Sequence, residues 1–146
     1  MVFRLPVTLP PVLRDLVPGV VSGPDVDATG KRVLVTGASG TFGRAIAAEL
    51  TARGAHVVGL DLAPRSDDSI EVVACDITDD ASTEAGVARA IEVLGGLDVL
   101  INNAGIGGKV AIEDESLDLF RRAMEINVTA LWHLAKLSSP SMIEAG

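Results

Sequence analysis

The chain has 146 residues, of which 48% are hydrophobic, so it can bury one ordinary core and gives no argument for a second domain. Its formal net charge of -8 disfavours nucleic acid and anionic membranes as partners. Cys75 is the single cysteine, which excludes an internal disulfide and fits a reducing, cytoplasmic compartment.

Residues 1–29 are expected to form a proline-rich N-terminal extension. Prolines interrupt its apolar runs well short of the roughly 18 residues that a membrane-spanning helix needs. No small-residue cleavage site follows a long apolar segment, so we expect no signal peptide. The extension can hold one short helix around residues 12–17, and a misassigned start codon is the alternative explanation.

From residue 31 onward, short β-branched runs alternate with amphipathic stretches, which is typical of βαβ units that build a parallel sheet. Strands are expected at 31–36, 55–60, 70–74 and 97–101, and helices at 42–50, from Asp79 to Gly95, and from about Ser116 to about Leu137. The sequence thus predicts a Rossmann-type, doubly wound parallel α/β fold over residues 30–146, truncated after the fourth strand and the helix that follows it.

The stretch TGASGTFG, residues 36–43, lies between the first expected strand and the first helix. Gly37, Gly40 and Gly43 follow one another at intervals of three, and such a turn offers a phosphate unhindered N–H groups and the positive end of a helix dipole. Glycine triplets also occur in plain tight turns. The strand before the turn, the helix after it and Asp61 at the end of the second strand together favour a dinucleotide-binding turn.

Asp61 follows Gly43 by 18 residues, where a carboxylate can accept hydrogen bonds from the ribose diol of adenosine. The same carboxylate would repel a 2′-phosphate, so NAD is favoured over NADP. Arg65 is the opposing signal, because its guanidinium could reach a 2′-phosphate. The glycine turn itself holds no basic residue, and NAD remains the expected cofactor.

From Lys31 onward the chain resembles the N-terminal half of the short-chain dehydrogenase/reductase (SDR) family. The motifs that carry the resemblance are the glycine turn, CDI at 75–77, NNAG at 102–105 and EINV at 125–128. The resemblance implies that Asp76 contacts the adenine amino group, that residues 102–105 lie along the cofactor, and that Asn127 belongs to the catalytic set.

The expected site thus combines one catalytic residue, Asn127, with a larger cofactor-binding set. That set is Thr36, Gly37, Ser39, Gly40, Thr41, Phe42, Gly43, Asp61, Leu62, Asp76, Ile77, Asn103, Ala104 and Gly105. No metal site is expected, because His56 and His133 have no cysteine or carboxylate at ligand spacing.

The glycine turn departs from the TGxxxGxG pattern of the compact SDR subtype, because Thr41 stands at the position of its middle glycine. The spacing resembles the TGxxGxxG of the extended subtype, whereas NNAG and the position of Asn127 favour the compact one over a longer stretch of matching order. A β-branched residue at position 41 would narrow the room for a pyrophosphate.

The helix that contains Asn127 carries apolar residues nearly all round, namely Met124, Leu131, Trp132, Leu134 and Leu137. One face of a sheet cannot cover all of them. We therefore expect a homo-oligomer formed through the helix around residues 128–137, and the SDR resemblance implies the same.

SDR enzymes move the proton that accompanies hydride transfer with a serine, a tyrosine and a lysine four residues after the tyrosine. This sequence contains no tyrosine, and we expect those groups to belong to an absent C-terminal half. The expected function is an NAD-dependent oxidoreductase of secondary alcohols or ketones, represented by its cofactor-binding half and inactive as given. Its fourth strand would lie at a sheet edge, so we expect marginal folding or association.

Two other classes of function fit the same residues less well. A non-catalytic NAD-binding or regulatory module would need no tyrosine. A fragment of an S-adenosylmethionine-dependent methyltransferase would also combine a glycine turn with an acidic residue after the second strand, but the NNAG motif disfavours it. The motif equally disfavours a sugar-nucleotide epimerase, which the glycine spacing alone would allow.

Overall fold

The computed structural model describes residues 27–107 and 111–146. The short helix expected around residues 12–17 lies outside these ranges. Across the described part of the chain, every helix is too short or too polar to cross a membrane.

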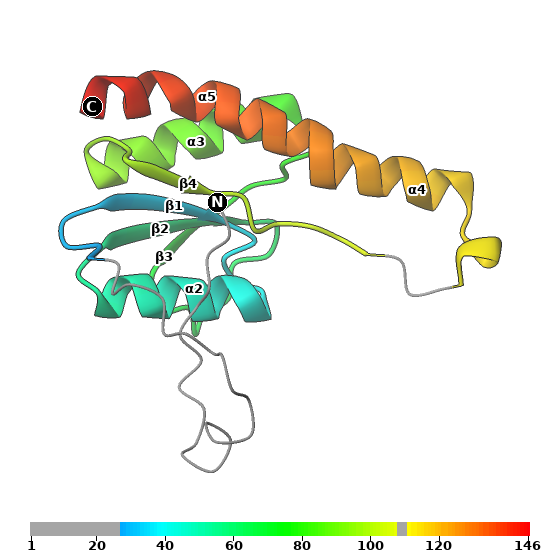
Figure 1. Cartoon of the computed structure of the whole chain (residues 1–146), viewed down its shortest axis with the longest axis horizontal. Helices are drawn as coiled ribbons and strands as arrows, with labels where there is room; N and C mark the ends of the chain where they lie inside the picture. The colour runs from blue at the N-terminus through cyan, green and yellow to red at the C-terminus, as the bar shows by residue number, and fades with distance from the viewer. Residues whose placement is uncertain (1–26, 108–110) are drawn as a thin grey trace, which may run out of the picture.

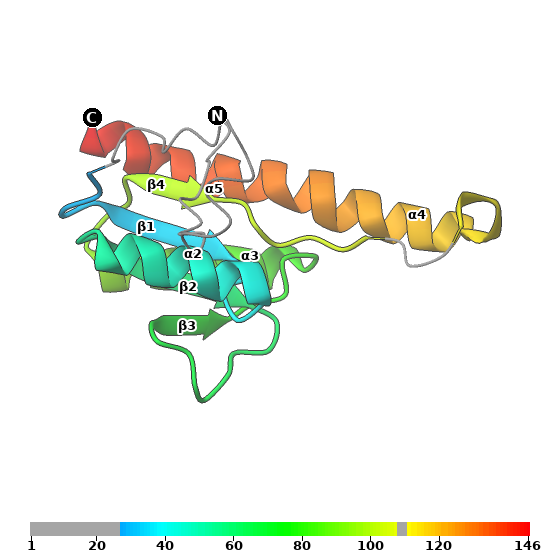
Figure 2. The same ribbon diagram turned by 60° about the horizontal axis from the view of Figure 1, so that its bottom comes forward.

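The described residues form a parallel sheet with helices on both faces (Figure 1). The elements are β1 (Arg32–Thr36), α2 (Thr41–Ala52), β2 (His56–Asp61), β3 (Glu71–Ala74), α3 (Asp80–Leu94), β4 (Val99–Ile101), the 3-10 turn η1 (Ile112–Asp114), α4 (Leu117–Met124), the π-helical turn η2 (Glu125–Thr129) and α5 (Ala130–Ala145). The strand order is β3-β2-β1-β4. Helix α2 covers one face, and α3 with α5 covers the other (Figures 1 and 2). The predicted Rossmann-type α/β fold is confirmed.

Strand β1 lies inside the sheet and is buried on both faces. Leu34 packs in a cluster with Val87 of α3 and Leu134 of α5, whereas Val33 and Val35 lie in a second cluster beside α2. Because side chains alternate along a strand, one apolar run supplies both cores. The second cluster also includes Ala28, so packing begins two residues before the expected domain boundary at residue 30.

The helix ends follow the expected capping chemistry at three places. The Asp79 side chain accepts a hydrogen bond from Ser82 N at 2.7 Å and caps α3, and Gly95 ends that helix with a φ of 69°. The Ser116 hydroxyl accepts from Leu119 N at 3.1 Å and caps α4. Local side chains therefore define where the predicted helices begin and end.

Helical structure continues from α4 through η2 into α5 and ends at Ala145, so the predicted end near Leu137 was wrong. Pro140 lies inside α5 and lacks the N–H group that would bond the Lys136 carbonyl oxygen. The Ser139 hydroxyl donates to that oxygen at 3.0 Å instead. This substitute donor removes part of the penalty for proline inside a helix.

The amino ends of β1 and β4 are joined by Arg32 and Asp98. The two Asp98 oxygens accept bonds from Arg32 Nε at 3.0 Å, Nη2 at 2.8 Å and the backbone N–H at 2.7 Å. Arg32 Nη1 also donates to the Gly95 carbonyl oxygen at 2.8 Å. These bonds hold the pKa of the Asp98 carboxyl far below its ordinary value.

We expect the Asp98→Asn variant to melt a few degrees below wild type at neutral pH, because an amide cannot accept all three bonds. A carboxyl whose pKa is lowered by folding stabilises the fold above its unfolded pKa and loses this contribution as pH falls toward the folded value. The gap in melting temperature should therefore shrink in acid, which thermal circular dichroism from about pH 7 to about pH 2 would measure. A gap that is constant with pH would contradict the assignment.

Candidate cofactor-binding site

A cavity of about 420 Å³ lies at the carboxyl ends of the strands, where ligands bind in open parallel sheets. Twelve of the expected cofactor-binding residues line it: Gly37, Gly40, Thr41, Phe42, Gly43, Asp61, Leu62, Asp76, Ile77, Asn103, Ala104 and Gly105. Thr36, Ser39 and Asn127 are not among its lining residues. The fold thus brings residues from separate motifs to one cavity. Of the three that do not line it, Thr36 and Ser39 are buried and Asn127 is exposed.

The glycine turn approaches other backbone too closely for side chains. A Cβ atom on Gly43 would collide with the Gly37 carbonyl oxygen and lie 2.7 Å from Ala38 Cα. Gly37 has a φ of 64°, and a Cβ there would lie 3.0 Å from Ala104 Cα. These glycines let the turn close tightly on itself and against the loop after β4.

The turn delivers the amino end of α2 to the cavity. Gly40 is the N-cap and forms no side-chain capping bond, and the first N–H groups of a helix have no partner inside the helix. Thr41, the first residue of α2, is exposed and lines the cavity. The result is a set of backbone donors at the positive end of a helix dipole, facing an open space.

Thr36 and Asn103 bind the ends of β1 and β4 to each other. Thr36 is fully buried, and its Oγ1 accepts hydrogen bonds from the backbone N–H groups of Asn103 and Ala104, both at 3.0 Å. Asn103 Nδ2 donates to the carbonyl oxygens of Thr36 at 2.9 Å and Gly37 at 3.2 Å. Thr36 therefore acts from behind the cavity wall by fixing the NNAG loop against the glycine turn.

Two carboxylates line the cavity at different strand ends. Asp61 Oδ2 accepts from Ser39 N and Oδ1 from Ala63 N, both at 3.0 Å. Asp76 Oδ1 accepts from Thr78 N at 2.9 Å and from the Thr78 hydroxyl at 2.7 Å. The Thr78 donors hold the pKa of Asp76 below its ordinary value, so this carboxylate is ionised at neutral pH.

Asn127 lies in the π-helical turn η2, an irregularity that is often found at functional sites. Its Oδ1 accepts from Ile106 N at 2.9 Å, and its Nδ2 donates to the Ile106 carbonyl oxygen at 2.8 Å. Asn102 Nδ2 also donates to the Leu131 carbonyl oxygen at 3.5 Å. The side chain of Asn127 therefore holds the loop after β4 on the helix.

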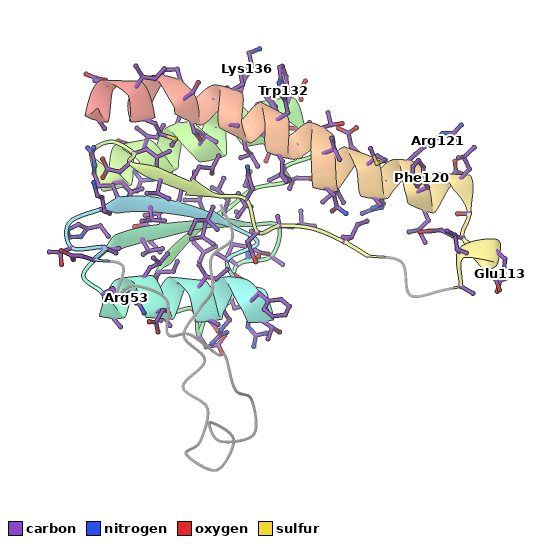
Figure 3. All side chains as sticks on the ribbon, viewed as in Figure 1. Arg53, Glu113, Phe120, Arg121, Trp132 and Lys136 are labelled. Atoms are coloured by element: carbon purple, nitrogen blue, oxygen red, sulfur yellow. The ribbon has the colours of Figure 1, made fainter. Side chains whose placement is uncertain are left out.

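Arg122 and Ile126 also line the cavity, and sequence reasoning missed both. They are four residues apart and so share one face of the helix, which is the signal that could have found them. The neighbouring Arg121 instead pairs with Asp118 at 3.0 Å and lies on the side of α4 away from the loop after β4 (Figure 3). Arg122 thus adds a positive charge to the side of the cavity that contains Asp76.

Within residues 27–107 and 111–146, no cluster of three or more His, Cys, Asp or Glu side chains could hold a metal ion. His56 is exposed. His133 Nδ1 lies 3.5 Å from an Asp80 oxygen, so it has a single carboxylate neighbour at the start of α3.

The sequence is similar to sequences of known proteins. A family model described as short chain dehydrogenase matches residues 31–146. The 7alpha-hydroxysteroid dehydrogenase of Escherichia coli is 37% identical over 128 residues, which cover 80% of this chain and 50% of the relative. The chain therefore spans about half the length of this curated relative.

Solved structures give the same result for the fold. Aldohexose dehydrogenase of Thermoplasma acidophilum superposes with a TM-score of 0.74 at 32% identity, over 81% of this chain and 46% of that one. The 3-ketoacyl-(acyl-carrier-protein) reductase of Brucella melitensis, solved in complex with NADH, gives a TM-score of 0.72 at 32% identity, over 80% and 52% of the two chains.

We expect Thr36→Val to destabilise the protein by roughly 1–3 kcal/mol, because two buried N–H groups lose their acceptor while the side-chain volume stays the same. Thr36→Ser, which keeps the hydroxyl, is the matched control and should lose less. Urea unfolding of the two variants and wild type measures the difference. Equal stability of Thr36→Val and Thr36→Ser would show that the hydroxyl is not what joins the two strand ends.

Proposed function

The chain belongs to the short-chain dehydrogenase family, and on that basis we propose that it binds NAD in the cavity at the carboxyl ends of its strands. The observation that carries this proposal is the glycine turn closed against the NNAG loop, with Asp61 at the neighbouring strand end. The glycines let the turn pack tightly on its own backbone, and Gly37, Gly40 and Gly43 line the cavity at the start of α2, which is where a pyrophosphate would bind.

In this proposal each wall of the cavity binds one part of the cofactor. The N–H groups at the start of α2 hold the pyrophosphate, and Asp61 accepts hydrogen bonds from the adenosine ribose. Asp76 and Ile77 contact the adenine, and residues 103–105 lie along the nicotinamide half. Arg122 adds a cation near the adenine end.

NAD is proposed over NADP because a 2′-phosphate would lie against the Asp61 carboxylate. The basic residue that could have compensated, Arg65, forms an ion pair with Asp67, with Arg65 Nε 3.0 Å from Asp67 Oδ1. The NADH complex of the reductase from Brucella melitensis is consistent with this choice.

We propose a positioning role for Asn127. Bound NAD supplies a hydride acceptor for alcohol oxidation. Both polar atoms of the Asn127 side chain are bonded to Ile106, which lines the cavity. These two bonds fix the loop after β4, and each polar atom of the amide keeps capacity for a second hydrogen bond, such as one to a catalytic water.

The proposed reaction of the whole protein is hydride transfer between NAD and a secondary alcohol or ketone. Relatives named for hydroxysteroid and aldohexose oxidation support this substrate class. The 146 residues hold no tyrosine, so we expect binding without turnover from this chain and propose that it supplies the cofactor-binding half. We also propose a cytoplasmic location, with which a single unpaired cysteine is compatible.

We expect the chain to bind NAD more tightly than NADP, and Asp61→Ala to weaken NAD binding by about tenfold, the loss of about 1.4 kcal/mol. Isothermal titration with NAD, NADP and S-adenosylmethionine measures this directly. Asp114→Ala, at an exposed position in η1 and outside the cavity lining, is the control and should bind like wild type. Tighter binding of S-adenosylmethionine than of NAD would support the methyltransferase alternative and overturn the proposal.

We also propose that the chain self-associates through α4 and α5. Leu117, Phe120, Met124, Val128 and Trp132 are between 42% and 65% exposed and recur every three or four residues along one helical face. Trp132 and Lys136 lie on the outer side of α5, away from the sheet, with Lys136 Nζ 5.4 Å from the centroid of the Trp132 ring (Figure 3).

We expect Trp132→Glu to shift the protein from a dimer or larger assembly to a monomer, because it replaces the most exposed of these five apolar side chains with a charge. Ile112→Glu is the matched control, since Ile112 is 86% exposed but lies outside α4 and α5. Sedimentation velocity over a range of protein concentrations measures the assembly state. A wild-type protein that stays monomeric throughout would contradict the proposal.

A further inference from the structure

The loop between β2 and β3, residues 62–70, folds back onto the glycine turn. The Ser39 hydroxyl donates to Asp68 Oδ2 at 2.5 Å, and Arg65 N donates to the same oxygen at 2.8 Å. Arg44 Nη1, from α2, lies 3.0 Å from Asp67 Oδ1 and 3.7 Å from Asp68 Oδ1. Asp68 therefore links Ser39 to Arg65 and Arg44, and Arg44 also pairs with Asp67.

This network lies directly beside the ribose site of the proposed function, on which the inference rests. Ser39 N donates to Asp61 Oδ2, so one residue bonds both the proposed ribose-binding carboxylate and Asp68. NADP differs from NAD by a phosphate on the ribose 2′-oxygen. Ser39 does not itself line the cavity, but its N–H group bonds the carboxylate that would bind this ribose, so we expect a 2′-phosphate there to approach Ser39.

The groups in this network are those that proteins use to bind a phosphate. A serine hydroxyl and two guanidinium groups, from Arg44 and Arg65, can all donate charge-assisted hydrogen bonds to phosphate oxygens. Here each is already bonded to a carboxylate, either Asp67 or Asp68. The loop thus supplies its own anion to the donors that a 2′-phosphate would need.

The Asp68 side chain is unusually buried for a carboxylate in a loop. Its side chain is 5% exposed, and its Oδ1 is buried without a hydrogen-bond partner in the described structure, with Arg44 at 3.7 Å. The Ser39 hydroxyl lowers the pKa of Asp68, and Arg44 and Arg65 lower that of Asp67, so both carboxyls are ionised at neutral pH.

We propose that Asp67 and Asp68 are specificity-determining residues that exclude NADP by occupying Ser39, Arg44 and Arg65. This mechanism acts in addition to the charge of Asp61. Three carboxylates and two guanidinium groups surround the position, which leaves a net charge of about -1. Without the Asp67 and Asp68 charges, the net charge around the same position becomes about +1, and three groups that can donate hydrogen bonds to a phosphate become free.

The test is the double variant Asp67→Asn, Asp68→Asn, titrated with NAD and NADP at fixed ionic strength. We expect NADP affinity to rise by about tenfold while NAD affinity changes by less than about threefold. The control is Asp114→Asn, Asp118→Asn, which changes the net charge of the chain equally at exposed positions outside the cavity lining. It should leave the ratio of the two affinities unchanged.

Further variants separate the effect of freeing the donor groups from an effect on folding. Adding Ser39→Ala to the double variant should remove part of the NADP gain, because it removes one of the three proposed ligands. If the double variant unfolds, the single Asp67→Asn replaces it and should show a smaller gain in the same direction. Thermal unfolding of each variant identifies the folded ones.

The outcomes distinguish this inference from the proposed function. Suppose that wild type binds NAD and the double variant folds. If the variant gains no NADP affinity, or loses affinity for both cofactors equally, the inference is overturned and the proposed function still stands. An equal gain in the Asp114 and Asp118 control would assign the effect to net charge and also overturn it. Wild type that binds neither dinucleotide overturns the proposed function, and the inference with it.

Discussion

The contact between β1 and β4 fixes the glycine turn against the NNAG loop, and with them one wall of the cavity. At the carboxyl ends, the buried Thr36 hydroxyl accepts two N–H groups of the NNAG loop, and Asn103 returns two bonds to the glycine turn. At the amino ends, Arg32 binds Asp98 with several bonds. With both ends of the strand pair fixed, the backbone at Gly37 can stay within van der Waals contact of Ala104, and the cavity keeps its shape.

The carboxylates of the domain divide by the kind of donor that binds them. Asp98 is bonded to a guanidinium and serves the fold. Asp61 accepts only from backbone N–H groups, and among the described residues it forms no ion pair, so its negative charge is not neutralised locally. A carboxylate held in place by neutral donors keeps its full charge for a ligand, which is the property that recognition of a ribose diol requires.

Local patterns allowed most of the fold and much of the cavity to be predicted. The strands, the Asp79 cap, the glycine turn and Asp61 all depend on neighbours in sequence, and the structure contains each of them. The continuation of α5 to Ala145 was missed. It includes Pro140, which is tolerated there because the Ser139 hydroxyl binds the Lys136 carbonyl oxygen. The contact of Asp68 with Ser39 joins residues 29 apart, so only the folded loop brings them together.

Two physical effects can exclude a 2′-phosphate, and they differ in range. The charge of Asp61 acts through space, so ions in solution screen the exposed part of its repulsion. Occupancy of Ser39 and Arg44 by the carboxylates of the 62–70 loop acts at contact distance, where little solvent can enter around the 5% exposed Asp68 side chain. High salt should therefore weaken the repulsion by Asp61 and the exposed ion pairs of Asp67 more than the bond between Asp68 and Ser39. Cofactor choice in this domain would then depend on a short connection between two strands, and the sheet itself would only have to hold that connection beside the glycine turn.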